Sequence, residues 1–232
     1  MSNYYETAQD LIRASNEDLN PKKWGFVIYR CTYSSQNKWD KFLSLIKEDA
    51  REYLENEKNQ DLWESMEWSV VEDRELDGVD YKEARRKFDH WVRSELENQT
   101  EVDTETWMEP DCSEEEIFQY RLSEQPPRHQ FFIFADEASV NSVVDCDKAN
   151  NRGMPGGYYI TLVQTGLLDR GEELHPEVAE EYDLEETDED YWCDFRQKFK
   201  AWDVVALYAS ILNGDWPDGF AEHDGVSEIM RF

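Results

Sequence analysis

The stretch Trp24-Gly-Phe-Val-Ile-Tyr-Arg-Cys-Thr-Tyr33 decides how this chain is expected to fold. It is rich in β-branched and aromatic residues, and it is apolar on both faces, which is typical of a strand buried in the middle of a sheet. It follows Pro21, a natural entry to extended structure. We therefore predict a central strand here.

A strand, a helix and a second strand are predicted around this stretch. Ser34 and Ser35 are suited to cap a helix. Apolar residues then recur at steps of three and four, as on one face of an amphipathic helix: Trp39, Phe42, Ile46, Ala50 and Tyr53. The run 66–72 reads as a second strand with Met66, Trp68 and Val70 on one face.

The next predicted helix begins at Asp80. The Asp80 carboxylate, with Glu83 three residues later, resembles a capping box. In the following segment, 97–128, the periodicity weakens, which favours an excursion or a mobile connection.

A shorter strand-helix-strand unit follows. Phe131–Phe134 is predicted as a third buried strand, 136–144 as a short helix and 158–163 as a fourth strand. After the acidic residues comes a stripe that predicts a long C-terminal helix ending near Asn213: Trp192, Phe195, Phe199, Trp202, Ala206 and Ala209.

These elements predict an α+β fold, namely a ferredoxin-like four-stranded sheet packed by helices, with an acidic insertion and a long C-terminal helix. Right-handed crossovers would make the two strands of each unit parallel. We expect one domain over residues 1–232, with a core at about 20–165 and the acidic segment and final helix at about 170–214.

The charge is unevenly distributed along the chain. Residues 1–60 carry 10 acidic and 9 basic side chains, whereas residues 61–232 carry 44 and 15. An excess of this sign repels phosphate backbones and anionic lipid headgroups, so the sequence argues against direct nucleic-acid or membrane binding. It permits attraction to a basic protein surface, and acidity also serves simple solubility.

A run within 177–190 is the sharpest local signal, because nine of its fourteen residues are acidic and none is basic. We expect it to dock a basic partner. The alternative is a solvated loop followed by a helix capped at Thr187. The candidate partner-binding residues are Glu177, Glu180, Glu181, Asp183, Glu185, Glu186, Asp188, Glu189 and Asp190.

No catalytic, cofactor or metal motif is assembled in the sequence. Nucleophile-elbow, Walker and dinucleotide-binding patterns are absent. The Cys and His residues lack the close spacing of zinc ligands, and the run from Asp145 departs from a calcium loop. The carboxylate pair Asp136 and Glu137 is suited to acid/base chemistry, but 54 acidic residues make such pairs common. No catalytic, cofactor-binding or metal residue is therefore predicted.

The opening block resembles a family of uncharacterised intracellular proteins of filamentous fungi. The resemblance is carried by Lys23-Trp-Gly-Phe-Val-Ile-Tyr-Arg-Cys-Thr-Tyr33, by Trp39 and by Val70-Val-Glu-Asp-Arg74, and it covers roughly residues 20–165. It implies a fungal, cytosolic origin. It carries over no catalytic or binding residue.

The sequence as a whole favours a non-enzymatic, acidic interaction protein that engages a basic partner, with nucleic-acid mimicry as one form of this function. The alternative is a small-molecule binder or enzyme with an aromatic-lined cavity in the ferredoxin-like fold. A third reading is self-recognition through a symmetric interface. The first residues lack a secretory signal and no run is long enough to span a bilayer, so a cytoplasmic or nuclear location is expected.

Overall fold

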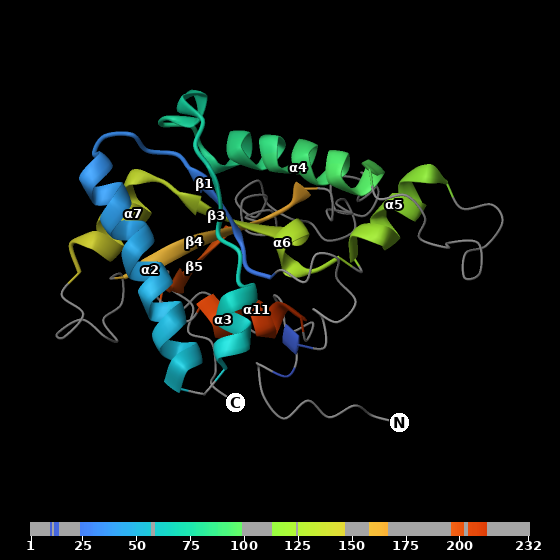
Figure 1. Cartoon of the computed structure of the whole chain (residues 1–232). Helices are drawn as coiled ribbons and strands as arrows, with labels where there is room; N and C mark the ends of the chain where they lie inside the picture. Colours follow the sequence, from blue (N-terminus) through green and yellow to red (C-terminus); the bar gives the residue numbers. More distant parts are fainter. Residues whose placement is uncertain are drawn as a thin grey trace, which may run out of the picture.

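The structure is a computed structural model, and it describes residues 10, 12–13, 24–56, 59–98, 113–123, 125–146, 158–166, 196–201 and 204–212. Within these ranges the chain forms a mixed sheet of five strands in the order β2-β1-β3-β4-β5, with helices on both sides (Figure 1). The strands are β1 (Val27–Arg30), β2 (Ser69–Val71), β3 (Phe131–Ala135), β4 (Tyr159–Gln164) and β5 (Arg196–Lys200).

Strand β1 lies in the interior of the sheet, as its composition predicts. It pairs in parallel with β2 on one side and with β3 on the other. All four of its residues are buried. A strand with neighbours on both edges and helices on both faces has no solvated side, which explains why its sequence is apolar throughout.

The helices are α2 (Gln36–Asn56), α3 (Gln60–Ser65), α4 (Tyr81–Asn98), α5 (Glu114–Ser123), α6 (Pro127–Gln130), α7 (Glu137–Val144) and α11 (Val204–Leu212), with a 3₁₀ turn at Arg74–Leu76. The first turns of α2 and α4 use the predicted side-chain caps. The Lys38 amide donates to Ser35 Oγ at 3.3 Å, and the Glu83 amide donates to Asp80 Oδ1 at 2.9 Å. The two main helices predicted from sequence are thereby confirmed.

The sheet separates two apolar cores, so the molecule has three layers. Phe26 and Ile28 of the first stretch pack with α2, α3, α7 and α11. Val27 and Tyr29, which point to the other face, pack with α4 and α5. The alternation follows from the period of two along a strand. Figure 1 shows α4 on one side of the sheet and α2 with α7 on the other.

The ferredoxin-like expectation is wrong in its strand count, because the sheet has five strands rather than four. The parallel pairing predicted within each unit holds for β1 and β2 but fails for β3 and β4, which are antiparallel. Helix α7 has only eight residues, and Ser142 near its end holds the start of β4, donating to the Tyr159 carbonyl at 2.9 Å. The chain therefore enters β4 beside the end of β3 and runs back.

The predicted long C-terminal helix is also corrected. Of its stripe, Phe199 lies in a strand, β5, and Ala206 and Ala209 lie in a short helix, α11, whereas Trp192, Phe195 and Trp202 lie outside the described residues. Strand β5 pairs antiparallel with β4, and Phe199 is fully buried between the flanking lysines. The spacing from Phe195 to Phe199 matches one helical turn, and sequence periodicity alone could not reveal that β4 had an unpaired edge to fill.

The segment 97–128, predicted as an excursion, contains the end of α4, all of α5 and the start of α6 among its described residues. Phe118 and Leu122 of α5 are buried against α4 and the sheet. Among the residues that the structure describes, no helix is both long and apolar enough to cross a bilayer.

Candidate functional site

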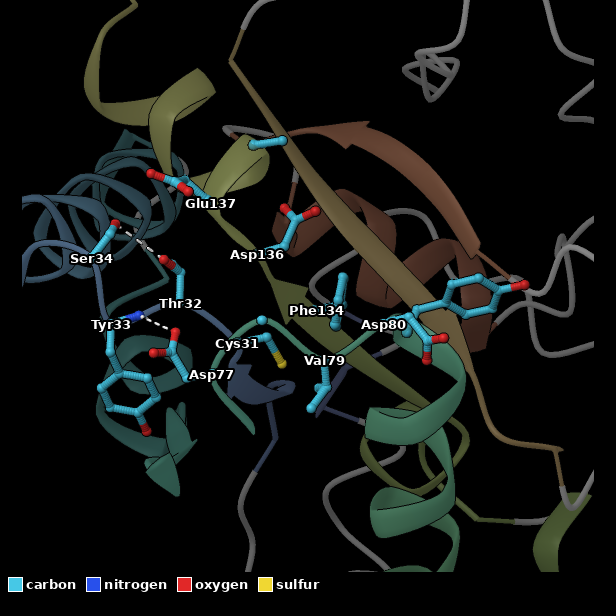
Figure 2. Close-up of a pocket in the computed structure, with 13 residues that line it drawn as sticks. Cys31, Thr32, Tyr33, Ser34, Asp77, Val79, Asp80, Phe134, Asp136 and Glu137 are labelled. Carbon is cyan, nitrogen blue, oxygen red and sulfur yellow. Dashed lines mark hydrogen bonds between the residues drawn. The ribbon is translucent and has the colours of Figure 1, made fainter. Parts of the chain in front are cut away.

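A cavity of about 560 Å³ lies where the three parallel strands end (Figure 2). Its walls come from the segments that follow β1, β2 and β3, which reach the same edge of the sheet because these strands run in one direction. The lining residues are Cys31, Thr32, Tyr33, Ser34, Asp77, Gly78, Val79, Asp80, Tyr81, Phe134, Asp136, Glu137 and Ala138. The position is the one where open α/β sheets bind ligands, outside the carboxyl ends of the strands where the strand order reverses.

Backbone hydrogen bonds fix the innermost part of this cavity. The Cys31 amide donates to the Ala135 carbonyl at 3.0 Å, and the Gly78 amide donates to the Cys31 carbonyl at 3.1 Å. Gly78 has φ +75°, a left-handed conformation that suits glycine. The ends of β1 and β3 and the segment before α4 are thus joined at one residue, Cys31.

A buried arginine sets the wall formed by residues 32–34. Arg30 is 3% exposed; its Nε donates to the Thr32 carbonyl at 3.0 Å and its Nη1 to Glu72 Oε1 at 3.1 Å. Its guanidinium carbon lies 4.1 Å from the centre of the Tyr33 ring and 4.9 Å from that of Trp39. Glu72 also accepts from Trp39 Nε1 at 2.7 Å. The Arg30 charge is therefore compensated away from the cavity.

Three aspartates at the cavity each hold a backbone amide with one oxygen. Asp77 Oδ1 accepts from the Tyr33 amide at 3.0 Å, Asp80 Oδ1 from the Glu83 amide at 2.9 Å, and Asp136 Oδ1 from the Ser139 amide at 2.7 Å. Asp80 and Asp136 are helix caps, and a carboxylate in that position also favours the helix dipole. These bonds fix the rotamers of the three side chains.

The cavity carries negative charge with no positive charge in its lining. Asp77, Asp80, Asp136 and Glu137 are all acidic, and the lining contains no Lys, Arg or His. Within the described ranges none of the four forms a salt bridge. Burial, and then the negative charge of Asp136, raise the pKa of the Cys31 thiol to about 12.

These features indicate what the cavity can do chemically. A thiol with a raised pKa is a poor nucleophile, so the geometry does not favour catalysis by Cys31. Among the described residues no group of three His, Cys, Asp or Glu side chains is arranged to hold a metal ion. A cluster of carboxylates with an apolar base formed by Cys31, Val79 and Phe134 suits the charged end of an organic cation.

The structure gives different outcomes for the residues considered from the sequence. All nine candidate partner-binding residues, Glu177 to Asp190, lie outside the described residues. Asp136 and Glu137, considered as an acid/base pair, lie at the cavity together with Asp80, a residue noted in the sequence only as a cap. His90 is exposed on α4, and His129 is buried against Trp91.

The cavity itself was missed by sequence reasoning, although a signal for it exists. Each of the three parallel strands is followed by polar residues: 32–34 after β1, Asp77 and Asp80 after β2, and Asp136 and Glu137 after β3. Recognising that these segments meet requires knowing that β1, β2 and β3 are adjacent and parallel. Because a ferredoxin-like sheet was predicted instead, the adjacency of these three strands was not recognised.

Comparison with known proteins gives no match, since no protein-family model, no curated protein and no solved structure matches this chain. The resemblance to fungal intracellular proteins therefore stays a prediction. The cavity and the charge of the chain are therefore the features that bear on function.

Proposed function

We propose that this chain is an acidic, non-enzymatic interaction protein that engages a basic protein partner, and that the cavity at the carboxyl edge of the sheet receives a basic side chain of that partner. The observation that carries the proposal is a cavity of about 560 Å³ lined by four carboxylates and no basic residue. An intracellular site of action, in the cytoplasm or nucleus, is part of the proposal.

The charge of the whole chain supports this reading. A net formal charge of −30 attracts a cationic partner over a distance and raises the rate of encounter. The cavity would then supply what long-range attraction lacks, namely a defined place for one side chain. In this proposal the net charge attracts the partner, and the Asp80 and Asp136 side chains, held by their hydrogen bonds, determine where its basic side chain binds.

The acidic run of residues 177–190 is proposed as a second contact. Its nine carboxylates would widen the negative surface presented to the partner. One form of the proposal is mimicry of nucleic acid, in which carboxylates occupy a groove that otherwise binds phosphates. Replacing the nine acids by Asn and Gln should weaken binding and flatten its dependence on salt concentration.

Calorimetric titration with an oligolysine peptide at low salt tests the role of the cavity. The double variant Asp80→Asn/Asp136→Asn removes two charges and retains capping, because Asn caps helices about as well as Asp. We expect this variant to bind the peptide at least about fivefold more weakly than the unmodified chain, since each lost charge-assisted hydrogen bond contributes more than 1 kcal/mol.

The matched control is Glu48→Gln/Glu52→Gln. Both residues are exposed on the C-terminal half of α2, and within residues 34–56 only Ser34, which precedes this helix, lines the cavity. The control removes the same charge far from the cavity. Equal losses of affinity in the two double variants would mean that only the overall field attracts the peptide, and the cavity would then have no role in the interaction.

A second candidate function, binding of a small organic cation, is favoured by the volume of the cavity. A volume of about 560 Å³ falls in the range of small-molecule sites. The same titration with free n-butylamine distinguishes the two. If the free amine binds as tightly as the peptide and with the same dependence on Asp80 and Asp136, the ligand is a small amine and no protein partner is needed.

A further inference from the structure

Strand β2 is an edge of the sheet, because among the described residues it pairs with β1 and with no other strand. Just before β2, the Glu67 amide donates to the Trp24 carbonyl at 2.7 Å, on the side of β1. Backbone groups of successive residues alternate between the two sides of a strand. The amides of Ser69 and Val71 therefore face β1, whereas the N–H and C=O groups of Val70 face outward. Within the described part of the chain these outward groups have no backbone partner.

The two edges of the sheet differ in how they are protected against pairing. Free edges are commonly protected by basic side chains, by proline or by a covering segment. The five residues of β5 include Arg196, Lys198 and Lys200. The stretch 66–72, which contains β2, has no lysine, arginine or proline, and all three residues of β2 are partly accessible. An extended segment can therefore add to this edge through main-chain hydrogen bonds, as in β-strand addition.

The charge around β2 identifies the kind of segment that fits its edge. Residues 61–77 carry seven acidic side chains and one basic side chain. Arg30 and Lys87 offset part of this charge, but Glu64 and Glu75 are exposed before and after β2 along the chain. A second copy of this chain would bring the same acidic surroundings and a net charge of −30 to the edge. A segment rich in lysine or arginine is attracted instead.

We propose that the outer edge of β2 binds an extended, basic segment of the partner as an additional strand of the sheet. The basic character of the partner rests on the proposed function, and the strand edge is a second surface besides the cavity. Because β2 has only three residues, the main-chain bonds are few. They position the segment at Val70, and the acidic residues of 61–77 favour lysine and arginine in it.

The experiment adds an acetylated and amidated peptide of four Lys-Thr repeats to the full chain at low salt and follows the backbone amides by NMR. Threonine favours extended structure. The control peptide has the same sequence and charge, but its central amides are N-methylated and cannot donate to a strand edge. We expect the first peptide to shift the resonances of residues 66–72 and to slow hydrogen exchange of the Val70 amide. It should bind at least about tenfold more tightly than the control, because each hydrogen bond contributes about 1 kcal/mol.

The outcomes separate this proposal from the function on which it rests. Equal affinities of the two peptides would overturn strand addition. Shifts confined to the cavity residues 31–34, 77–81 and 136–138 would also overturn it and leave the proposed function standing. Protection of the Val70 amide that rises with protein concentration in the absence of peptide would mean that a second copy occupies the edge. No binding of either peptide would overturn both the proposal and the proposed function.

The substitution Val70→Pro tests the assigned position. It removes the outward N–H, and proline is tolerated on an edge strand where that group faces away from the sheet. We expect this variant to bind the two peptides equally, whereas Glu48→Gln/Glu52→Gln, which removes charge on α2, should retain the tenfold difference. A difference retained in Val70→Pro would overturn the assignment to β2. If this variant does not fold, protection of the Val70 amide in the unmodified chain still decides the question.

Discussion

Gly25 stands at the entry to β1 in a conformation that excludes a side chain. Its φ is +113°, and a Cβ atom there would lie 2.6 Å from the carbonyl oxygen of Glu67. That carbonyl cannot easily move, because the Glu67 amide donates to the Trp24 carbonyl at 2.7 Å. The close approach of these two backbones starts the pairing between β1 and β2, so the glycine determines how the sheet begins.

Replacing Gly25 by alanine should lower the free energy of unfolding by at least about 2 kcal/mol, since both backbone strain and the contact with Glu67 oppose the methyl group. Urea denaturation followed by tryptophan fluorescence measures the change. The control is Gly78→Ala, where φ is +75° but nothing lies within 4 Å of the added Cβ. It should cost about 1 kcal/mol from strain alone; equal effects would mean that the contact is unimportant.

His129 is a buried histidine whose ionisation opposes folding. It is 8% exposed, its ring stacks on Trp91 with centroids 5.5 Å apart, and its Nδ1 has no hydrogen-bond partner among the described residues. Burial, and then the positive charge of Arg128, lower the pKa of His129 to about 4. The neutral ring is therefore the form that the folded chain accommodates.

The sign of the resulting pH dependence follows from this lowered pKa. The stability that the chain gains by burying neutral His129 is fully present above the ordinary histidine pKa of 6.5. This stability is lost as the pH falls from 6.5 toward about 4, because the unfolded chain binds the proton first. It amounts to roughly 3 kcal/mol over that range. We expect the stability of the unmodified chain to fall relative to that of His129→Phe between about pH 7 and about pH 4, measured by urea denaturation. Parallel curves for the two proteins would contradict the assignment.

At the scale of single residues, the sequence identified the roles that depend on local geometry. The caps at Ser35 and Asp80 could be predicted, because capping involves residues only three positions apart. The burial of Arg30 could not, since its partner Glu72 lies 42 residues further along the chain, directly after β2. A charged residue in an apolar strand does not reveal which distant carboxylate will compensate it.

The elements at the end of the chain show how an edge of a sheet can decide secondary structure. Strand β5 covers the edge of β4, and its last three residues place the buried Phe199 between Lys198 and Lys200. Lys198 is exposed and its ammonium lies 4.5 Å from the centre of the Tyr159 ring. Basic side chains on an edge strand also discourage pairing with another chain.

The substitution Phe199→Ala should lower the free energy of unfolding by about 3 to 5 kcal/mol, the usual effect of removing a fully buried phenylalanine. The matched control is Lys198→Ala, which should change it by less than about 1 kcal/mol because the side chain is exposed. Thermal or urea denaturation measures both. A small effect of Phe199→Ala would indicate that β5 contributes little to the core.

At the scale of elements, prediction succeeded where the pattern was long and failed where two periods overlapped. The stripe from Trp39 to Tyr53 extends over several turns, and α2 forms as expected. The run from Phe195 to Ala209 has helical spacing as well, yet pairing with β4 makes residues 196–200 a strand. The reason is tertiary, because backbone groups at the free edge of β4 are satisfied by a neighbouring strand.

The whole molecule carries far more negative than positive charge, with 54 acidic and 24 basic residues. Such an excess destabilises the compact state through self-repulsion. The sheet and its two cores must offset this repulsion by burial of apolar surface, and 41 hydrophobic residues of the described chain are buried.

Salt should therefore stabilise this protein. Raising NaCl from about 10 mM to about 150 mM shortens the Debye length from about 30 Å to about 8 Å and weakens repulsion between surface carboxylates. We expect the midpoint of urea denaturation to increase over this range. The uncharged denaturant keeps the ionic strength under control. A midpoint that falls with salt would mean that ion pairs such as Arg128 with Glu67 outweigh the repulsion.

At this scale the sequence predicted the class of fold and not its topology. The alternation of strands and helices indicated a mixed α and β structure, because each element carries its own period. The order β2-β1-β3-β4-β5 depends on which edges meet, and that information is distributed over the chain. The candidate site was missed for the same reason, since its carboxylates come from three separate segments.

The central place of β1 has a consequence for how the chain is made. Val27 pairs with Ser69 on one side, but its other neighbour, Phe132, is synthesised more than one hundred residues after it. During translation one edge of this apolar strand therefore stays unpaired until β3 has left the ribosome. Parallel pairing of such distant segments is slow, so the interval before β3 arrives is when a nascent chain most needs protection from aggregation.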